Sequence, residues 1–451
     1  MPAGPRRDLT RTAKIGAAVV LLIAPALISF NYIFRFGVDV PYWDAWQFVP
    51  LLGDFYEGNL RLADLTHQHN EHRIVLPRVA MLIVARLTRY NTIAEMYATW
   101  LMLCAIVSLY WVVHRRSLGL SQSSLVTFLP IAWFALTLRQ YENLLWGWQI
   151  LVALAFLLLV ASLFFIAGAP DQPWRLILAI AAACGCTFSL ANGLVVWPAG
   201  LAQLILLGRG RRSGPGRSRA MIAAWTVAGA ACVALYLRGY RAPVGHPPLL
   251  QPFKDPLRFV LGLCAVLGNP FTGRAMLAPA LGAALLALVG ALFVLAAQGR
   301  VDWQRAPLAI PLILSSLLTA IFIVSGRSGL GMPELTISRY VTFVIPCFVG
   351  TQMAMLAIRD RTSRLFFSVG LLPLAGAGVF ASFDGTYAAG RERRAVMVAY
   401  QQRLLNYRSL PDSDLTGLFI DPVLVRKGAD ILQTYRLSVF RGAAGASADL
   451  R

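Results

Sequence analysis

Three of the chain's five histidines lie in the segment 67–73, beside a carboxylate, an amide and a guanidinium, although only 14% of the chain is charged. Imidazole and carboxylate groups in such a cluster can bind a polar substrate or a divalent metal ion. Their spacing fits no standard zinc pattern, and a solvated loop is the alternative interpretation. The candidate substrate-binding residues are His69, Asn70, Glu71, His72 and Arg73, and the weaker candidates for metal ligands are His69, Glu71 and His72.

An acidic motif precedes this cluster. It reads Asp39-Val-Pro-Tyr-Trp-Asp44 and leads into an amphipathic helical pattern that ends at Gly58. A carboxylate within hydrogen-bond reach of a hydroxyl can take its proton as a general base. Asp44 lies at the start of the amphipathic helix, so we predict that Asp44 is the catalytic base. Asp39 is the second candidate for this role.

Two further polar clusters interrupt apolar runs. One holds Arg139, Glu142 and Asn143, and the other holds Arg327 and the pair Arg339-Tyr340. A guanidinium at a membrane interface can bind a lipid phosphate bidentately. The alternatives are an Arg139–Glu142 pair with a structural role and arginines that extend to the interface among aromatic residues. We predict that Glu142, Asn143, Arg327, Arg339 and Tyr340 bind the substrate.

The elements that must position these residues are transmembrane helices. The chain is 57% hydrophobic with a mean hydropathy of +0.63, and its charged fraction is well below the roughly 25% of soluble proteins. Apolar runs near the ~20 residues that cross a bilayer recur along it. We expect an all-α polytopic membrane protein with about eleven spans: 15–34, 91–113, 122–138, 150–168, 175–190, 193–208, 220–238, 276–297, 307–325, 340–358 and 364–383.

The basic residues predict the orientation. The net charge is +20, and arginines concentrate in the alternate short loops 115–116, 209–219, 300–305 and 359–364. By the positive-inside rule these loops and the N-terminus are cytoplasmic, which places the C-terminus and every polar cluster outside. The same distribution argues against nucleic acid as a partner. The apolar stretch 256–271 would break the alternation, so we interpret it as an interfacial or re-entrant helix.

Two long regions lie outside the membrane in this arrangement. Residues 35–90 form a first extracytoplasmic loop with two interfacial helices, the second over 75–88. Residues 384–451 form a small helical tail, which Pro411 and Pro422 punctuate. We therefore expect a transmembrane domain over 1–383 followed by this tail. The six cysteines all lie in apolar segments and form no zinc pattern.

The order of these features resembles the GT-C superfamily of integral-membrane glycosyltransferases, such as protein O-mannosyltransferases and aminoarabinose transferases. The shared order is a first span, an acidic motif at Asp44, a helix ending near Gly58, a His-containing turn at 69–73 and a second interfacial helix. The segment also resembles a bacterial multi-pass family that carries Asn-Glu-His-Arg in this loop. Here Trp43-Asp44-Ala45 stands where many relatives have paired Asp-Glu.

The resemblance implies a function and a location. A polyprenyl-phosphate-linked sugar enters from the bilayer at the outer face of a bacterial inner membrane. Asp44 takes the proton of an acceptor hydroxyl on a glycan, lipid or protein, the sugar is transferred with inversion, and Arg339 neutralises the leaving phosphate. No organic cofactor is implied, and a divalent metal is an open alternative.

Several other functions are alternatives to sugar transfer. A polysaccharide polymerase or ligase would share the lipid-linked donor. A lipid or sugar transporter would place ionisable groups at mid-span and show related halves, and a non-catalytic scaffold is a further alternative. The transferase hypothesis predicts that Asp44, His72 and Arg339 meet at one cavity.

Overall fold

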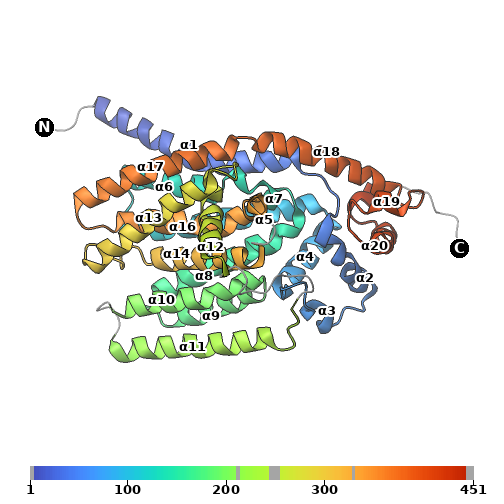
Figure 1. Ribbon diagram of the computed structural model, residues 1–451, viewed down its shortest axis with the longest axis horizontal. Helices are drawn as coiled ribbons and strands as arrows, with labels where there is room; N and C mark the ends of the chain where they lie inside the picture. The colour runs from blue at the N-terminus through green and yellow to red at the C-terminus, as the bar shows by residue number, and fades with distance from the viewer. Residues whose placement is uncertain (1–4, 210–213, 243–253, 328–330, 443–451) are drawn as a thin grey trace.

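The computed structural model describes residues 5–209, 214–242, 254–327 and 331–442. Long helices run side by side along the molecule, and short helices from the first loop and the tail gather at one end (Figure 1). Among the described residues the only β-pairing is two isolated bridges, His69–His72 and Val301–Ile358. The fold is all-α, as the sequence predicts.

Each of the eleven expected spans falls on a helix. Within the described residues, nine helices are long and apolar enough to cross a membrane. The other two, α6 and α9, have 14 residues each, or about 21 Å at 1.5 Å per residue. The eleven helices are α1 (Pro5–Phe36), α5 (Thr92–Leu118), α6 (Gln122–Ala135), α8 (Ile150–Gly168), α9 (Trp174–Thr187), α10 (Val196–Gly208), α11 (Pro215–Leu237), α13 (Ala278–Ala297), α14 (Ala309–Arg327), α16 (Val341–Leu356) and α17 (Arg361–Phe383).

The stretch expected to be interfacial or re-entrant forms α12 (Pro256–Gly268), which does not cross the bundle. This helix has 13 residues, and the ends of its neighbours along the chain show how it is placed. α11 ends where the Arg238 carbonyl accepts a bond from Arg73 of the first loop. α13 starts beside Asn269, which bonds to Ile337 at the same end. The chain therefore leaves and re-enters the bundle at one end, as the alternation of basic loops requires.

The basic loops gather at the opposite end of the molecule. Arg300 forms an ion pair with Asp360 at 2.9 Å, and the Val301–Ile358 bridge joins the same two loops. Arg217 donates to the Pro170 carbonyl, which brings the 209–219 loop to this end; residues 210–213 lie outside the described part. The structure thus separates basic loops from the polar clusters, as the sequence predicts.

Close helix packing keeps the bundle rigid. A Cβ at Gly350 of α16 would lie 2.5 Å from the Ala309 carbonyl of α14, so only glycine permits this approach. Phe134 of α6 stacks on Phe348 of α16 with ring centroids 4.0 Å apart. These contacts hold the helix ends, and the turns that follow them, in fixed positions.

Several helices begin with a 3₁₀ turn at the end away from the basic loops. η3 (Gly147–Gln149) precedes α8, η4 (Ala191–Val195) precedes α10, and η8 (Ser338–Tyr340) precedes α16. A fourth, η1 (Trp43–Gln47), opens the short helices of the first loop. Such short turns are common at helix termini, and here η1 carries Asp44 while η8 carries Arg339 and Tyr340.

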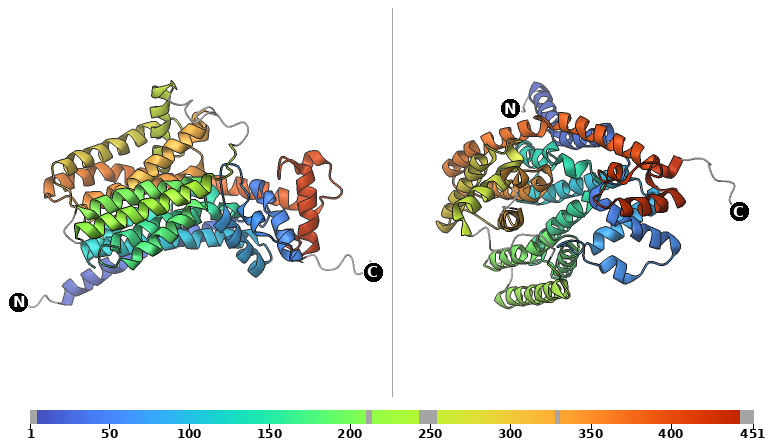
Figure 2. Two further views of the ribbon diagram at one scale, coloured as in Figure 1. Left: turned by 90° about the horizontal axis from the view of Figure 1, so that it is seen from below. Right: turned by 45° about the vertical axis from the view of Figure 1, so that its right-hand side comes forward.

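The first loop and the tail pack against each other. The loop contains α2 (Val49–Glu57), α3 (Leu62–Thr66) and α4 (Val75–Thr88), and the tail contains α18 (Thr386–Leu405), α19 (Asp412–Leu415) and α20 (Pro422–Thr434). α2 ends at Gly58 in a left-handed conformation, and α4 has the predicted bounds. One hydrophobic cluster joins both regions, and Figure 2 shows α20 beside the loop helices.

Candidate functional site

A cavity of about 600 Å³ opens at the end that carries the 3₁₀ turns. Its walls come from the first loop, the segments before α8 and α16, the end of α14, and α18. Nine of the predicted site residues line it: Asp44, His69, Asn70, Glu71, His72, Glu142, Arg327, Arg339 and Tyr340. The structure therefore brings Asp44, His72 and Arg339 to one cavity, although they come from distant parts of the chain.

The turn that carries Asp44 is held from several sides. The main-chain N–H of Trp43 donates to the Leu418 carbonyl of the tail at 2.9 Å. The Tyr42 carbonyl accepts a bond from the indole N–H of Trp146 at 3.1 Å. Trp43 adopts φ 49°, a left-handed conformation that is unusual for a bulky residue. These contacts present the Asp44 carboxylate, whose side chain is 31% exposed, to the cavity.

The histidine cluster forms a tight loop across the cavity wall. His69 and His72 exchange two main-chain hydrogen bonds, at 2.8 and 2.7 Å, and Asn70 between them has φ 48°. Asn tolerates this left-handed conformation better than most residues. The buried His69 ring packs against Trp148, and its Nε2 lies 3.9 Å from Asp44 Oδ2. The His69 ring therefore lies beside the Asp44 carboxylate, at the distance of an ion pair rather than of a hydrogen bond.

His72 is held as a neutral imidazole. Its Nδ1 accepts a hydrogen bond from the main-chain N–H of Ala191 at 3.2 Å, which leaves the proton on Nε2. Nε2 faces Glu71 Oε1 at 3.5 Å. Burial lowers the pKa of His72 to about 4, against an opposing effect of Glu71. The ring can therefore donate a hydrogen bond, but it carries no charge at neutral pH.

Glu142 and Arg339 form the opposite wall. The main-chain N–H of Arg339 donates to Glu142 Oε2 at 3.0 Å. The Glu142 N–H in turn donates to Ser338 Oγ at 3.0 Å, so the two segments are joined twice. The Arg339 guanidinium lies 3.3 Å from Glu334 and is one-third exposed. Its remaining donors are available to an anion in the cavity.

Two more arginines line the same cavity. Arg327 ends α14 and forms no hydrogen bond or ion pair within the described residues. Arg393 of α18 lies over the Tyr42 ring at 5.2 Å and donates from Nε to the Leu145 carbonyl. Its Nη2 is buried without a hydrogen-bond partner among the described residues. The sequence offered no signal for Arg393, because only the packing of the tail brings it to the cavity.

Three predicted site residues do not line the cavity. Asp39 is buried and binds Arg441 together with the main-chain N–H and hydroxyl of Thr92. Arg73 donates to the Tyr236 and Arg238 carbonyls at the end of α11. Asn143 donates to the Arg339 carbonyl and to Thr342. Each is committed to holding chain segments together, so their predicted roles in chemistry or substrate binding are not supported by their positions.

Arg139 does not pair with Glu142. Its guanidinium instead binds Asn269 at 2.8 Å, and the carbonyls of Thr272 and Thr336 at 3.1 and 2.9 Å. The arginine thereby fastens the turn after α12 to the segment before α16. It contributes to the site by fixing the cavity wall rather than by lining it.

The predicted metal ligands are not grouped around a common point. In the part of the chain that the structure describes, no three His, Cys, Asp or Glu side chains are arranged to hold a metal ion. His72 uses Nδ1 to accept a main-chain bond, and His69 is directed toward Asp44.

A small, mostly apolar pocket of about 20 Å³ adjoins the cavity. It lies between α8, α14 and α16 and shares Leu190, Asn192 and Phe343 with the cavity wall. Gly193 lets η4 pack closely on the end of α9, because a Cβ there would lie 2.0 Å from the Cys186 carbonyl. The polar cavity is thus bordered by apolar side chains.

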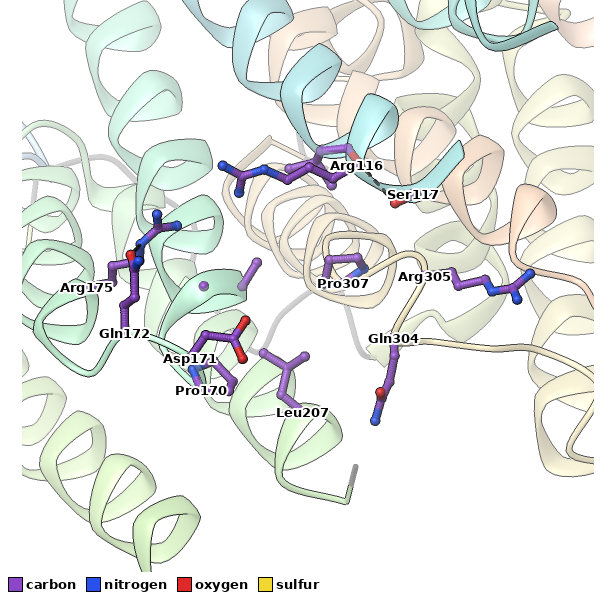
Figure 3. A pocket seen from close by; sticks show the side chains of 13 residues that line it. Arg116, Ser117, Pro170, Asp171, Gln172, Arg175, Leu207, Gln304, Arg305 and Pro307 are labelled. Atoms are coloured by element: carbon purple, nitrogen blue, oxygen red, sulfur yellow. Dashed lines mark hydrogen bonds between the residues drawn. The ribbon is translucent and has the colours of Figure 1, made fainter. Parts of the chain in front are cut away.

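A second cavity, of about 380 Å³, lies among the basic loops at the other end. Figure 3 shows Arg116, Asp171, Arg175 and Arg305 around it. Arg305 and Arg175 are bonded to Asp302 and Gln172 within their own loops. This cavity holds one carboxylate and no histidine among its lining residues, and it lacks the constellation of the first.

Comparison with solved structures gives one partial match. The chain superposes on ArnT from Cupriavidus metallidurans bound to undecaprenyl phosphate with a TM-score of 0.44 and 13% identity, over 94% of this chain and 77% of that one. No protein-family model and no curated protein sequence matches the chain. At this identity the match assigns no role to any residue.

Proposed function

We propose that the chain is a membrane glycosyltransferase that moves a sugar from a polyprenyl-phosphate donor to an acceptor hydroxyl. One observation carries the proposal: a single cavity sets the carboxylate of Asp44, the cationic groups of Arg327 and Arg339, and the apolar side chains of Phe322 and Ile323 on its walls. A donor with a phosphate head and a hydrocarbon chain needs both a cationic and an apolar surface.

The phosphate of the donor binds at the arginines. A guanidinium donates two parallel hydrogen bonds to a phosphate. Arg327 is the last residue of α14, and Arg339 lies on η8 just before α16. Glu142 holds the Arg339 main chain while the guanidinium stays at the cavity surface. The hydrocarbon chain lies along the apolar surface formed by Phe322 and Ile323 of α14.

Asp44 is the general base of the transfer. The acceptor oxygen attacks the anomeric carbon, its proton passes to the Asp44 carboxylate, and the bond from the anomeric carbon to the phosphate oxygen breaks. The electron pair of that bond remains on the phosphate, where the arginines stabilise the added charge. Attack opposite the leaving group inverts the anomeric centre. His69 orients Asp44, and neutral His72 donates a hydrogen bond to a substrate oxygen.

The location of the reaction follows from the basic loops. We assign the end with Arg116, Arg300 and Arg359 to the cytoplasm of a bacterium by the positive-inside rule. The cavity then opens at the outer face of the inner membrane. α1 begins on the cytoplasmic side and the tail lies outside.

The position of the cavity favours a transferase over a transporter. A transporter binds its substrate near the midplane, between two related halves. Here the charged groups lie at the ends of α14 and before α8 and α16, among 3₁₀ turns. A polymerase or ligase with a lipid-linked donor uses the same phosphate chemistry and differs in its acceptor.

The test is sugar transfer by the purified chain in lipid vesicles. A panel of undecaprenyl-phosphate sugars serves as donors, and glycan, lipid and peptide hydroxyl compounds serve as acceptors. Acceptor-dependent release of undecaprenyl phosphate is measured for the wild type, Asp44→Asn and Asp54→Asn. Asp54 lies on α2 of the same loop but does not line the cavity. We expect release to fall at least about 100-fold in Asp44→Asn and to stay within about twofold in Asp54→Asn. Equal rates in all three proteins would remove Asp44 from its role.

A further inference from the structure

We infer that the acceptor is an uncharged carbohydrate whose ring stacks on Trp43 beside Asp44, an inference that rests on the function proposed above. The cavity has two unlike walls. Arg327 and Arg339 form the wall at α14 and η8, and the carboxylates of Asp44 and Glu71 lie on the wall of the first loop. The phosphate of the donor belongs at the cationic wall, which leaves the first-loop wall to the acceptor.

Trp43 is the distinctive residue of this second wall. Its side chain is 43% exposed and lines the cavity, in contrast to the fully buried Trp46 one turn further. Its left-handed backbone is a conformation that structures retain mainly where their surroundings enforce it. The enforcing contact is the hydrogen bond from its N–H to the Leu418 carbonyl. The fold thus presents a large aromatic face immediately before the candidate base.

The chemistry of this wall fits sugar hydroxyls. The apolar C–H face of a pyranose ring covers an aromatic face, which otherwise exposes apolar area to water. Asp44 and Glu71, each 31% exposed, accept hydrogen bonds from hydroxyls, and His72 donates one from Nε2. Arg393 is the cation nearest to this wall, and it lies over the Tyr42 ring with its Nε bonded to the Leu145 carbonyl. A phosphate or carboxylate on an acceptor stacked on Trp43 would face Asp44 and Glu71 at short range and be repelled. The wall therefore selects a neutral sugar.

Binding of oligosaccharides to the purified chain in nanodiscs tests this inference without requiring turnover. The probes are an array of neutral tetrasaccharides, with tetragalacturonate as the acidic probe and undecaprenyl phosphate as the donor probe. The variants are Trp43→Ala, Trp43→Phe and, as the matched control, Trp174→Ala. Trp174 is 55% exposed on α9 and lies outside the cavity.

We expect a neutral tetrasaccharide to bind the wild type, to bind Trp43→Ala about tenfold more weakly, and to bind Trp43→Phe and Trp174→Ala within about threefold of wild type. Undecaprenyl phosphate should bind all four proteins equally. If undecaprenyl phosphate binds but no neutral tetrasaccharide does, or if tetragalacturonate binds best, the inference fails and the proposed transferase stands. If undecaprenyl phosphate does not bind the wild type either, the proposed function fails with it.

Discussion

The main-chain amide of Arg339 donates a hydrogen bond of 3.0 Å to the carboxylate of Glu142, which lies 197 residues earlier in the chain. The Glu142 carboxylate therefore binds the main chain of Arg339 and not its guanidinium. The guanidinium remains at the surface of the cavity, where Glu334 holds only one side of it. Glu142 is therefore a positioning residue, and substitutions of Glu142 should act through Arg339.

Glu142→Ala should raise the KM for the donor by about tenfold, since a hydrogen bond to a charged group contributes roughly 1.5–3 kcal/mol. Glu142→Gln retains an oxygen that accepts the Arg339 N–H and should keep most of the affinity. Donor titration of both variants measures the difference. Equal losses in Ala and Gln would mean that the negative charge of Glu142, rather than its hydrogen bond, matters.

Arg339→Ala should weaken donor binding by about 10- to 100-fold through loss of a charge-assisted contact to phosphate. Arg339→Lys should recover only part of this, because an ammonium cannot form the bidentate pair. Arg305→Ala is the control, since Arg305 is exposed at the opposite end of the molecule. Binding of undecaprenyl phosphate at low and moderate salt is the measurement, and a wild-type affinity in Arg339→Ala would contradict the phosphate assignment.

His72 should make stability depend on pH between about 4 and 6.5. Because burial lowers its folded pKa to about 4 from the ordinary 6.5, the unfolded chain binds more protons in this window. Stability is therefore fully present above pH 6.5 and is lost as the pH falls toward 4. His72→Asn keeps an acceptor for the Ala191 N–H without titrating in this range. Melting temperatures at pH 7 and pH 5 should differ less in this variant than in wild type; an unchanged difference would count against His72.

Asp39→Ala should destabilise the protein by about 2 kcal/mol or more without acting on chemistry directly, because it leaves Arg441 and Thr92 without their acceptor. Asp39→Asn keeps the bond from Thr92 and should cost less. Asp384→Ala, at an exposed position just after α17, serves as the control, with a loss below about 1 kcal/mol. Melting temperature and activity per folded molecule separate the two effects, and full stability with lost activity would return Asp39 to the catalytic candidates.

Labelling of single cysteines should place the cavity outside the cell. Asn70→Cys lies in the exposed part of the histidine loop, and Gln304→Cys lies among the basic loops. A membrane-impermeant maleimide added to intact cells should label the first variant, whereas the second should require permeabilised cells. Labelling of both from outside, or only of Gln304→Cys, would reverse the orientation and the proposed face of the reaction.

Periodicity and charge were sufficient to predict most of the helices. The sequence predicted a helix at each of the eleven expected spans, the bounds of α4 and the end of α2 at Gly58, because these depend on local hydropathy and on local breaks in it. It predicted a helical tail but not the 20-residue helix α18, which begins at Thr386 directly after α17. It also predicted that Asp44, His72 and Arg339 would meet. The sequence could not distinguish residues that line the cavity from residues that hold its walls together. Asp39, Arg73 and Asn143 have suitable chemistry but bind neighbouring segments, and Arg393 reaches the cavity only through the packing of the tail.

The contact of the tail with the first loop has a consequence for biosynthesis. The main-chain N–H of Trp43 donates to the Leu418 carbonyl, and the Asp39 carboxylate accepts from the Arg441 guanidinium. Both partners leave the ribosome only after every membrane helix has been made. The wall that carries Asp44 is therefore completed last, and a nascent or prematurely terminated chain inserts into the bilayer without an assembled centre.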